Sequence, residues 1–392
     1  MSIFAERMKT LGTETAFEVL AKAKALEKQG KDIVHLEIGE PDFDTPKNIK
    51  EAAVKALYAG YTHYVPAAGI PELREAIAEY ISKTRKIDVD PEEVVVAPGA
   101  KPIMLYAILA CVNPGEEVVY QNPGYPIFES LINFVRAKPV PIPLKEENDF
   151  RMDHEYVKEK ITKKTKMIII NSPENPTGGI LTREDLKLIA DCVADRDDVV
   201  ILSDEIYSRI IYEGEHESIA SLPGMKEKTI LLDGFSKTYA MTGWRLGYGV
   251  MRKDIAQKAT QLMINSNSCT CAFVQMAGVE ALKGPQDEVD RMVAEFKRRR
   301  EVIIPGLNEI EGISCKKPRG AFYAFPNITK LGMSSREFSD YLLNEAGVAV
   351  LPGTSFGEYG EGYLRLSFAT SVENIKKALN RIHEAVKKLR KP

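Results

Sequence analysis

Short apolar runs alternate with longer helical patterns along most of this 392-residue chain. Two of the runs, MIIIN at 167–171 and VVILSD at 199–204, are almost continuously apolar and lack the alternation of a half-exposed strand. Continuous apolar runs of this length are typical of strands that helices cover on both faces, as in a mostly parallel sheet. The pattern therefore predicts a doubly wound α/β architecture.

The rhythm changes after about Gly284, which predicts a second, α+β domain. Before that point the expected strands are Glu93–Ala97, Glu117–Tyr120, Met167–Asn171, Val199–Asp204, Thr229–Gly234 and Leu246–Met251, and the expected helices include Lys101–Val112, Pro126–Val135 and Arg183–Ala194. After it we expect a long helix at Asp287–Asn308, short strands around Gly320–Pro326, a helix at Ser335–Ala346, a strand at Tyr363–Phe368 and a terminal helix at Val372–Leu389. The basic run KRRR at 297–300 should lie on a solvated face of the long helix.

Charge and cysteine content narrow the possible partners. The net charge of −3 gives no basic excess for nucleic acid or an anionic membrane. The five cysteines lack Cys-x-x-Cys spacing, so we expect neither a disulfide framework nor a metal site. The first residues lack the apolar core of a signal peptide, and the apolar stretch Val94–Val112 is broken by Pro98 and Pro102. A reduced, cytoplasmic setting is the expectation.

The strongest indication of a reaction in the sequence is a single lysine, Lys237. Leu231–Gly247 read LLDGFSKTYAMTGWRLG, so Lys237 follows an apolar run that ends at Asp233. Burial there would lower the pKa of the Lys237 amine and make it a nucleophile toward a carbonyl. Ser236 and Arg245 beside it would suit a phosphate. An aldehyde that carries a phosphate, and that a lysine binds as a Schiff base, is pyridoxal 5'-phosphate (PLP).

The segment resembles the cofactor lysine region of the class I/II aminotransferases. Within that family, the chain most resembles the aspartate aminotransferase group. Five further segments match that family in order: LEIGEPDF (36–43), YVPAAGIPELREAI (64–77), NSPENPTGG (171–179), SDEIY (203–207) and YLRLSFA (363–369). The resemblance implies the PLP-dependent transferase fold of type I, with a seven-stranded sheet flanked by helices. It also implies a large PLP-binding domain at 46–285, a small domain built from 1–45 and 286–392, and a homodimer with shared active sites.

The cofactor ring needs a carboxylate for its pyridine nitrogen and donors for its phenolic oxygen. Asp204 ends an apolar run, and a buried carboxylate there needs a cation such as a protonated pyridine nitrogen. Alternatively, Asp204 caps a helix that begins after it. Tyr207, one helical turn later, is placed to donate to the ring oxygen. The resemblance gives Asn175 the same oxygen and places Tyr125 where the family stacks an aromatic side chain, which in many relatives is tryptophan.

The phosphate needs donors, and the expected ones are Ser236, Arg245 and the turn Gly99-Ala100-Lys101 before a helix. Free N–H groups at such a helix start bind anions. The resemblance adds Tyr64, which would reach the phosphate from the neighbouring subunit.

The substrate carboxylate needs a cation, and Arg365 lies within an apolar strand pattern, where a guanidinium is rare without an anion. Gly39 would let the backbone approach the same carboxylate, and Asn175 is expected beside it. In one branch of the family a lysine at the position of Lys101 binds the distal carboxylate of aspartate or glutamate. Alternatively, Lys101 is a solvated lysine at a helix start.

The expected reaction is transamination between an amino acid, with aspartate or glutamate preferred, and a 2-oxo acid such as 2-oxoglutarate. Lys237 would be the base for the proton transfer at the substrate Cα. Alanine and aromatic amino acids remain open as substrates, and so does a PLP-dependent lyase or synthase of the same fold. A nicotinamide enzyme is disfavoured because G-x-G-x-x-G is absent. A DNA-binding regulator is disfavoured because the chain has no basic patch.

Overall fold

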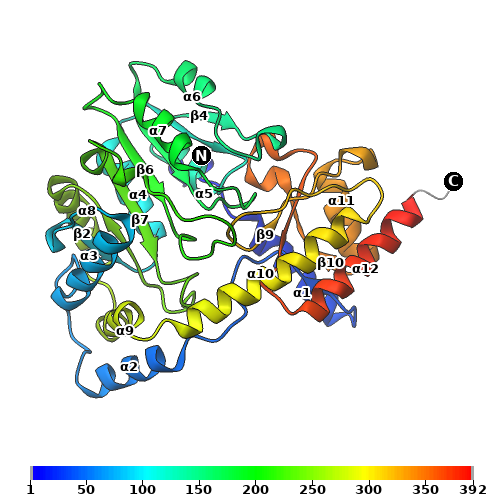
Figure 1. Cartoon of the computed structure of the whole chain (residues 1–392), viewed down its shortest axis with the longest axis horizontal. Helices are drawn as coiled ribbons and strands as arrows, with labels where there is room; N and C mark the ends of the chain where they lie inside the picture. The colour runs from blue at the N-terminus through cyan, green and yellow to red at the C-terminus, as the bar shows by residue number, and fades with distance from the viewer. Residues whose placement is uncertain (1–2, 390–392) are drawn as a thin grey trace.

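Seven strands form the central sheet in the order β2-β8-β7-β6-β5-β3-β4, in a computed structural model that describes residues 3–389 (Figure 1). The strands are β2 (Val94–Ala97), β3 (Glu117–Asn122), β4 (Lys138–Pro143), β5 (Thr165–Asn171), β6 (Val200–Asp204), β7 (Thr229–Gly234) and β8 (Gly247–Val250). β8 runs antiparallel to β2 and β7, and the remaining neighbours are parallel. The predicted mostly parallel, seven-stranded sheet is confirmed.

Side chains of each central strand enter two different cores, one on each face of the sheet. In β5, Ile168 and Ile170 pack on one face, whereas Met167 and Ile169 pack on the other. Each such side chain stabilises the fold by about 1.5–3 kcal/mol when fully buried. Burial on both faces explains why these strands appear in the sequence as continuous apolar runs.

Helices cover both faces of the sheet. α4 (Lys101–Cys111), α5 (Ile127–Phe134) and α8 (Lys253–Ser266) pack on one face. α3 (Pro71–Arg85), α9 (Ala272–Lys283), α6 (His154–Lys160) and α7 (Arg183–Asp191) pack on the other, with α2 (Lys47–Tyr58) against α9. All predicted elements of this part are present, with ends that shift by up to three residues.

One strand of the sheet was not expected from the sequence. β4 reads KPVPIP, with prolines at every second position: Pro139, Pro141 and Pro143. A proline cannot donate to a neighbouring strand, so it is tolerated only at a sheet edge. β4 is an edge strand that pairs with β3 alone, and its prolines alternate with residues that can donate.

The C-terminal part packs in a core that also contains Val34, Leu36 and Tyr207, and it combines helices with short strands, as expected after Gly284. α10 (Asp287–Asn308) lies against α12 (Val372–Leu389), and a small sheet holds β11 (Leu351–Pro352), β12 (Leu364–Ser367) and β9 (Tyr323–Ala324) (Figure 1). The expected helix at 335–346 is α11 (Ser335–Tyr341), continued by a π-helical turn at Leu342–Ala346.

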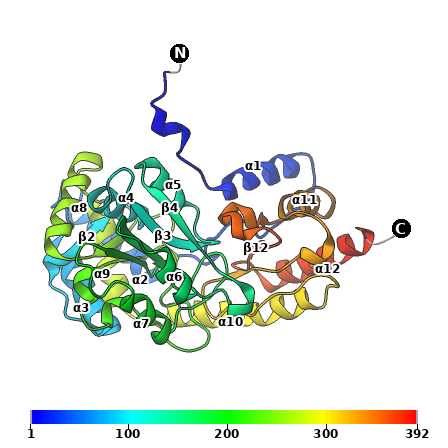
Figure 2. The ribbon, with the colours of Figure 1, turned by 90° about the horizontal axis from the view of Figure 1, so that it is seen from above.

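The N-terminal residues join this C-terminal part. β1 (Val34–His35) pairs in parallel with β10 (Val348–Ala349), and α1 (Thr15–Lys28) packs near β10 and β11. The first described residues, through the short 3-10 helix at Glu6–Lys9, extend away from the body of the molecule (Figure 2). The chain thus crosses from one part to the other near residue 45 and again at α10.

The expectation that KRRR at 297–300 is solvated is wrong for two of its four side chains. Lys297 and Arg298 are exposed, but Arg299 and Arg300 are buried. Arg299 pairs with Asp42 at 2.6 Å, and Arg300 donates to Pro318 O at 2.7 Å. Both guanidiniums also lie over aromatic rings, which suits their weakly hydrated planar faces.

Within residues 3–389, no helix is both long and apolar enough to cross a membrane. In the same range, no group of three or more His, Cys, Asp or Glu side chains is arranged to hold a metal ion. All five cysteines are free thiols.

Candidate active site

A cavity of about 530 Å³ lies where several strands of the sheet end. Asn171 and Asp204 are the last residues of β5 and β6 and are paired in register. Lys237 follows β7, and the turn Gly99-Ala100-Lys101 follows β2. Ligands of open α/β sheets bind at such carboxyl ends, so the sheet itself brings together residues that are distant in sequence.

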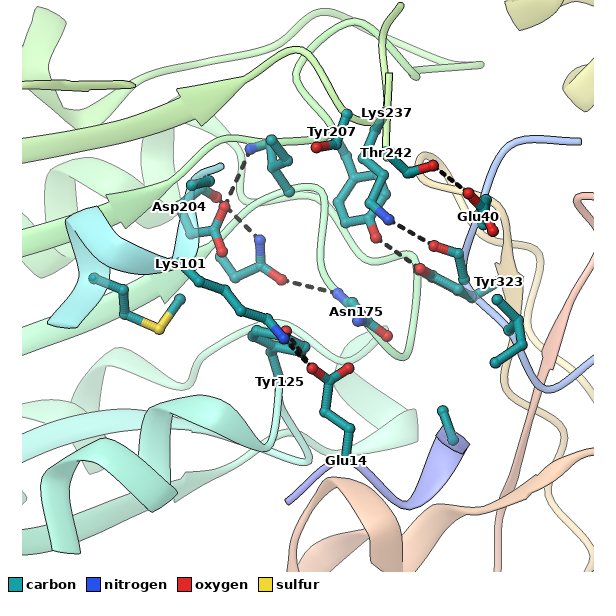
Figure 3. Close-up of a pocket in the computed structure, with 18 of the residues that line it drawn as sticks. Glu14, Glu40, Lys101, Tyr125, Asn175, Asp204, Tyr207, Lys237, Thr242 and Tyr323 are labelled. Carbon is teal, nitrogen blue, oxygen red and sulfur yellow. Dashed lines mark hydrogen bonds and ion pairs between the residues drawn. The ribbon is translucent and has the colours of Figure 1, made fainter. Parts of the chain in front are cut away.

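Lys237 lines this cavity, and its Nζ donates to Gly39 O at 2.6 Å (Figure 3). Burial lowers the pKa of the amine to about 8. The lowered pKa increases the fraction of the amine that is neutral near physiological pH, and the neutral form is the one that acts as a nucleophile and as a base.

Asp204 lies on the cavity wall with its carboxylate buried. Oδ1 accepts the Ile206 N–H at 3.2 Å, and no side chain among residues 3–389 forms an ion pair with it. Burial raises the pKa of Asp204 to about 7, and the nearby Asp233 and Glu205 add to the increase. A buried carboxylate without an ionic partner is stabilised either by a bound cation or by a proton.

The helix that the alternative interpretation of Asp204 required is absent. Residues 206–209 form a turn instead: the Glu205 N–H donates to Leu232 O of β7 at 2.8 Å, and the Ser208 N–H donates to Glu205 O at 2.8 Å. Asp204 therefore does not cap a helix. Tyr207 still reaches the cavity, and its hydroxyl lies 2.6 Å from the Tyr323 hydroxyl.

Arg365 is buried on β12 and lines the same cavity. Nη1 donates to Asn175 Oδ1 at 3.2 Å and Nη2 to Glu37 O, while the guanidinium lies 4.5 Å from the centre of the Tyr323 ring. Its Nε is buried without a hydrogen-bond partner in the described chain. An unpaired donor on a buried cation is a site for an anionic ligand.

The predicted phosphate donors also meet at the cavity: Ala100, Lys101, Ser236 and Arg245 all line it. Gly99 has φ +93°, and a Cβ there would collide with the Arg245 guanidinium. The turn before α4 therefore packs directly against the arginine, and the first N–H groups of α4 are left free by helix geometry.

The remaining predicted residues divide into two groups. Tyr125 and Gly39 line the cavity, as expected. Tyr64 is 87% exposed and is not among the residues lining the cavity of its own chain, so any contact with this site requires a second subunit.

The sequence did not indicate several other residues of the site: Glu14, Glu40, Asn171, Thr242 and Tyr323 all line the cavity (Figure 3). Asn171 links two strands, because its Nδ2 donates to Asp204 O at 3.0 Å and its Oδ1 accepts the Asn175 N–H at 2.9 Å. Asn171 is the polar end of an apolar run, and Glu40 and Thr242 lie within segments that match the family, but no pattern indicated a role for their side chains.

The donor set fits PLP. Asp204 needs a cation, Lys237 has a reactive amine, and the Arg245 turn offers phosphate donors in a cavity of suitable size. Arg365 remains free to receive a carboxylate. Together these groups define the site of a PLP-dependent enzyme that acts on amino acids.

Comparison with known proteins identifies the family. The profile "Aminotransferase class I and II" matches residues 31–382, so the chain belongs to this family. The enzyme is a transaminase that uses PLP and takes amino-acid and 2-oxo-acid substrates, which confirms that prediction over the lyase or synthase alternative.

Relatives with similar sequence identity to this chain are named for different substrates. The chain is 45% identical to an aspartate aminotransferase of Pyrococcus horikoshii, over 97% of both chains. It is 43% identical to the aromatic-amino-acid aminotransferase 2 of Thermococcus litoralis, over 91% of this chain and 92% of the relative. The structure of the aspartate aminotransferase from Thermus thermophilus with maleate matches with a TM-score of 0.94 at 37% identity, over 98% of this chain and 100% of that chain.

Proposed function

We propose that this aminotransferase prefers dicarboxylic amino acids, exchanging the amino group of aspartate or glutamate with 2-oxoglutarate. One observation carries the proposal: two cationic side chains, Arg365 and Lys101, line the cavity that also holds Lys237. Arg365 would bind the α-carboxylate that every amino acid has, with Gly39 and Asn175 beside it. Lys101 would bind the second carboxylate of an acidic substrate. The Thermus relative, whose structure contains the dicarboxylate maleate, supports this assignment.

We assign cofactor contacts by chemical fit. Lys237 would bond the aldehyde, Asp204 would hold the ring nitrogen, Tyr207 and Asn175 would donate to the phenolic oxygen, and Tyr125 would pack on the ring. Ser236, Arg245 and the N–H groups of Ala100 and Lys101 would hold the phosphate. When bound, PLP withdraws electrons from the substrate and so stabilises negative charge at Cα.

The proton at Cα would be transferred by Lys237, once the substrate amine has replaced it at the aldehyde and left its Nζ free. Its Nζ accepts the proton when neutral, and burial favours the neutral form by lowering the pKa to about 8. Arg365 fixes the substrate carboxylate, so that Cα is presented to one amine in one orientation.

The active enzyme is proposed to be a homodimer in which Tyr64 of one subunit reaches the phosphate of the other. Exposed apolar side chains on α2 support a subunit contact: Val54, Leu57 and Tyr58 are all exposed, and Tyr64 follows them. We also propose that the large domain spans 46–285 and the small domain 1–45 with 286–392. The β1–β10 pairing, which joins the N-terminal residues to the C-terminal part, supports this division.

The test is kcat/KM for aspartate and alanine, with 2-oxoglutarate as acceptor, in the wild type and in Lys101→Ala. Loss of a charge-assisted hydrogen bond costs about 1.5 kcal/mol or more, so kcat/KM for aspartate should fall roughly tenfold. Alanine has no second carboxylate and should be affected much less. Equal losses for both substrates, or a wild type that prefers alanine or phenylalanine, would contradict the dicarboxylate assignment.

A further inference from the structure

The end of the segment before α1 and the first turn of α1 lie against the active-site cavity. The Gly12 N–H donates to Ser130 Oγ on α5 at 2.9 Å, which anchors the segment on the large sheet's side. Two residues later Glu14 lines the cavity, followed by Ala16 and Phe17. Figure 3 shows the Glu14 side chain extending from this segment toward Lys101 and Tyr125.

The Glu14 carboxylate is already bound to the groups that an acidic substrate needs. Its Oε1 accepts from Lys101 Nζ and from Tyr125 Oη, the latter at 3.1 Å. The Lys101 ammonium lies 5.7 Å from the centre of the Tyr125 ring. The Glu14 side chain is only 19% exposed, against 47% for Lys101, so the pair lies at the boundary between cavity and solvent.

Helix capping does not account for this placement. Glu14 is the N-cap residue of α1, but its side chain makes no capping hydrogen bond. N-cap residues commonly use a short side chain to accept from the first turn of the helix. Here a longer side chain instead accepts from Lys101, which lines the same cavity.

We propose that Glu14 is a specificity-determining residue: its carboxylate competes with the distal carboxylate of the substrate for Lys101. The inference rests on the proposed role of Lys101. An acidic substrate must exchange Glu14 for its own carboxylate at the ammonium. A neutral amino acid leaves the Glu14–Lys101 pair intact as the wall of the cavity. The preference for acidic substrates is therefore set by the pair, and it is weaker than an unpaired Lys101 would produce.

The strength of the competition follows from exposure. A partly exposed ion pair contributes a factor of about 1.5 to 5 in an equilibrium constant. Glu14→Gln keeps the length of the side chain and an acceptor oxygen, but removes the charge. Lys101 would then be held by a neutral acceptor, which the charged carboxylate of a substrate displaces more easily.

The experiment uses PLP-loaded enzyme and two four-carbon acids that do not react, succinate and butyrate. Dissociation constants are measured by titration calorimetry in the wild type, Glu14→Gln, Lys101→Ala and the double variant. Glu18→Gln is the matched control, because Glu18 is an exposed glutamate on α1 that does not line the cavity. Ratios of kcat/KM for aspartate and alanine are measured on the same proteins.

Glu14→Gln should tighten succinate relative to butyrate by about two- to fivefold, and raise the aspartate-to-alanine ratio by a similar factor. Glu18→Gln should change neither ratio, and in the Lys101→Ala background Glu14→Gln should have no such effect. If Lys101→Ala weakens succinate selectively but Glu14→Gln leaves the ratios unchanged or lowers them, the role of Glu14 is wrong while the proposed function stands. If Lys101→Ala weakens succinate and butyrate equally, both are wrong.

Discussion

Asp204 makes the cofactor-free protein less stable than it would be with a neutral side chain at the same place. The carboxylate is buried without a cationic partner, and burial raises its pKa from 3.8 to about 7. Asp204→Asn keeps an oxygen that can accept the Ile206 N–H and removes the charge. We therefore expect the substitution to stabilise the cofactor-free protein at alkaline pH.

The size of the effect follows from the two pKa values. Between pH 3.8 and 7 the folded state binds more protons at Asp204 than the unfolded state does, so stability falls as pH rises and levels off above about 7. At about 1.4 kcal/mol for each pKa unit, the full destabilisation by the ionised group is about 4 kcal/mol. The gain from Asp204→Asn should be about 2.5 kcal/mol larger at pH 8 than at pH 5.

The assay is urea unfolding of cofactor-free wild type and variant at pH 5 and pH 8, followed by far-ultraviolet circular dichroism. Asp195→Asn is the control, because Asp195 is an exposed aspartate outside the cavity. With PLP bound the advantage of the variant should disappear, because the ring nitrogen then supplies the positive partner. If the increase in stability from Asp204→Asn is the same at both pH values, or persists with PLP bound, Asp204 is not a buried carboxylate that requires a cationic partner.

Three further predictions concern other parts of the site. Arg365→Ala should lower kcat/KM for aspartate and alanine alike, since both carry the α-carboxylate; a loss confined to aspartate would contradict the assignment. Mixed Tyr64→Ala and Lys237→Ala subunits should regain activity, because one hybrid site keeps both residues; no recovery after proven subunit exchange would count against a shared site. Arg85 is buried between two carboxylates, at 2.7 Å from Glu205 and 2.9 Å from Asp233. Arg85→Met should therefore lower the free energy of unfolding in urea titrations by about 3–5 kcal/mol; a small loss would mean that the two carboxyl groups are neutral.

The sequence predicted the parts of the fold that depend on local pattern. Strands covered on both faces were predicted from apolar runs, and Asp204 and Lys237 were predicted as site residues because each lies at or just beyond the end of such a run. β4 was not predicted, since its alternating prolines indicate a break unless the strand is known to lie at an edge.

Contacts between distant segments could not be predicted. Glu14 and Tyr323 enter the cavity from opposite ends of the chain, and neither has a neighbouring pattern that distinguishes it from a helix-start glutamate or a core tyrosine. For the same reason Arg299 and Arg300 resembled a solvated run, because their partners Asp42 and Pro318 lie on other segments.

The most direct test of the account is the position of the covalent bond to PLP. The purified enzyme is treated with borohydride, which fixes the cofactor on its lysine, and the labelled peptide is identified by mass spectrometry. We predict a single pyridoxyl group on Lys237, the largely buried amine whose pKa is lowered to about 8. A label on Lys101 or on any other lysine would contradict the assignment of the site.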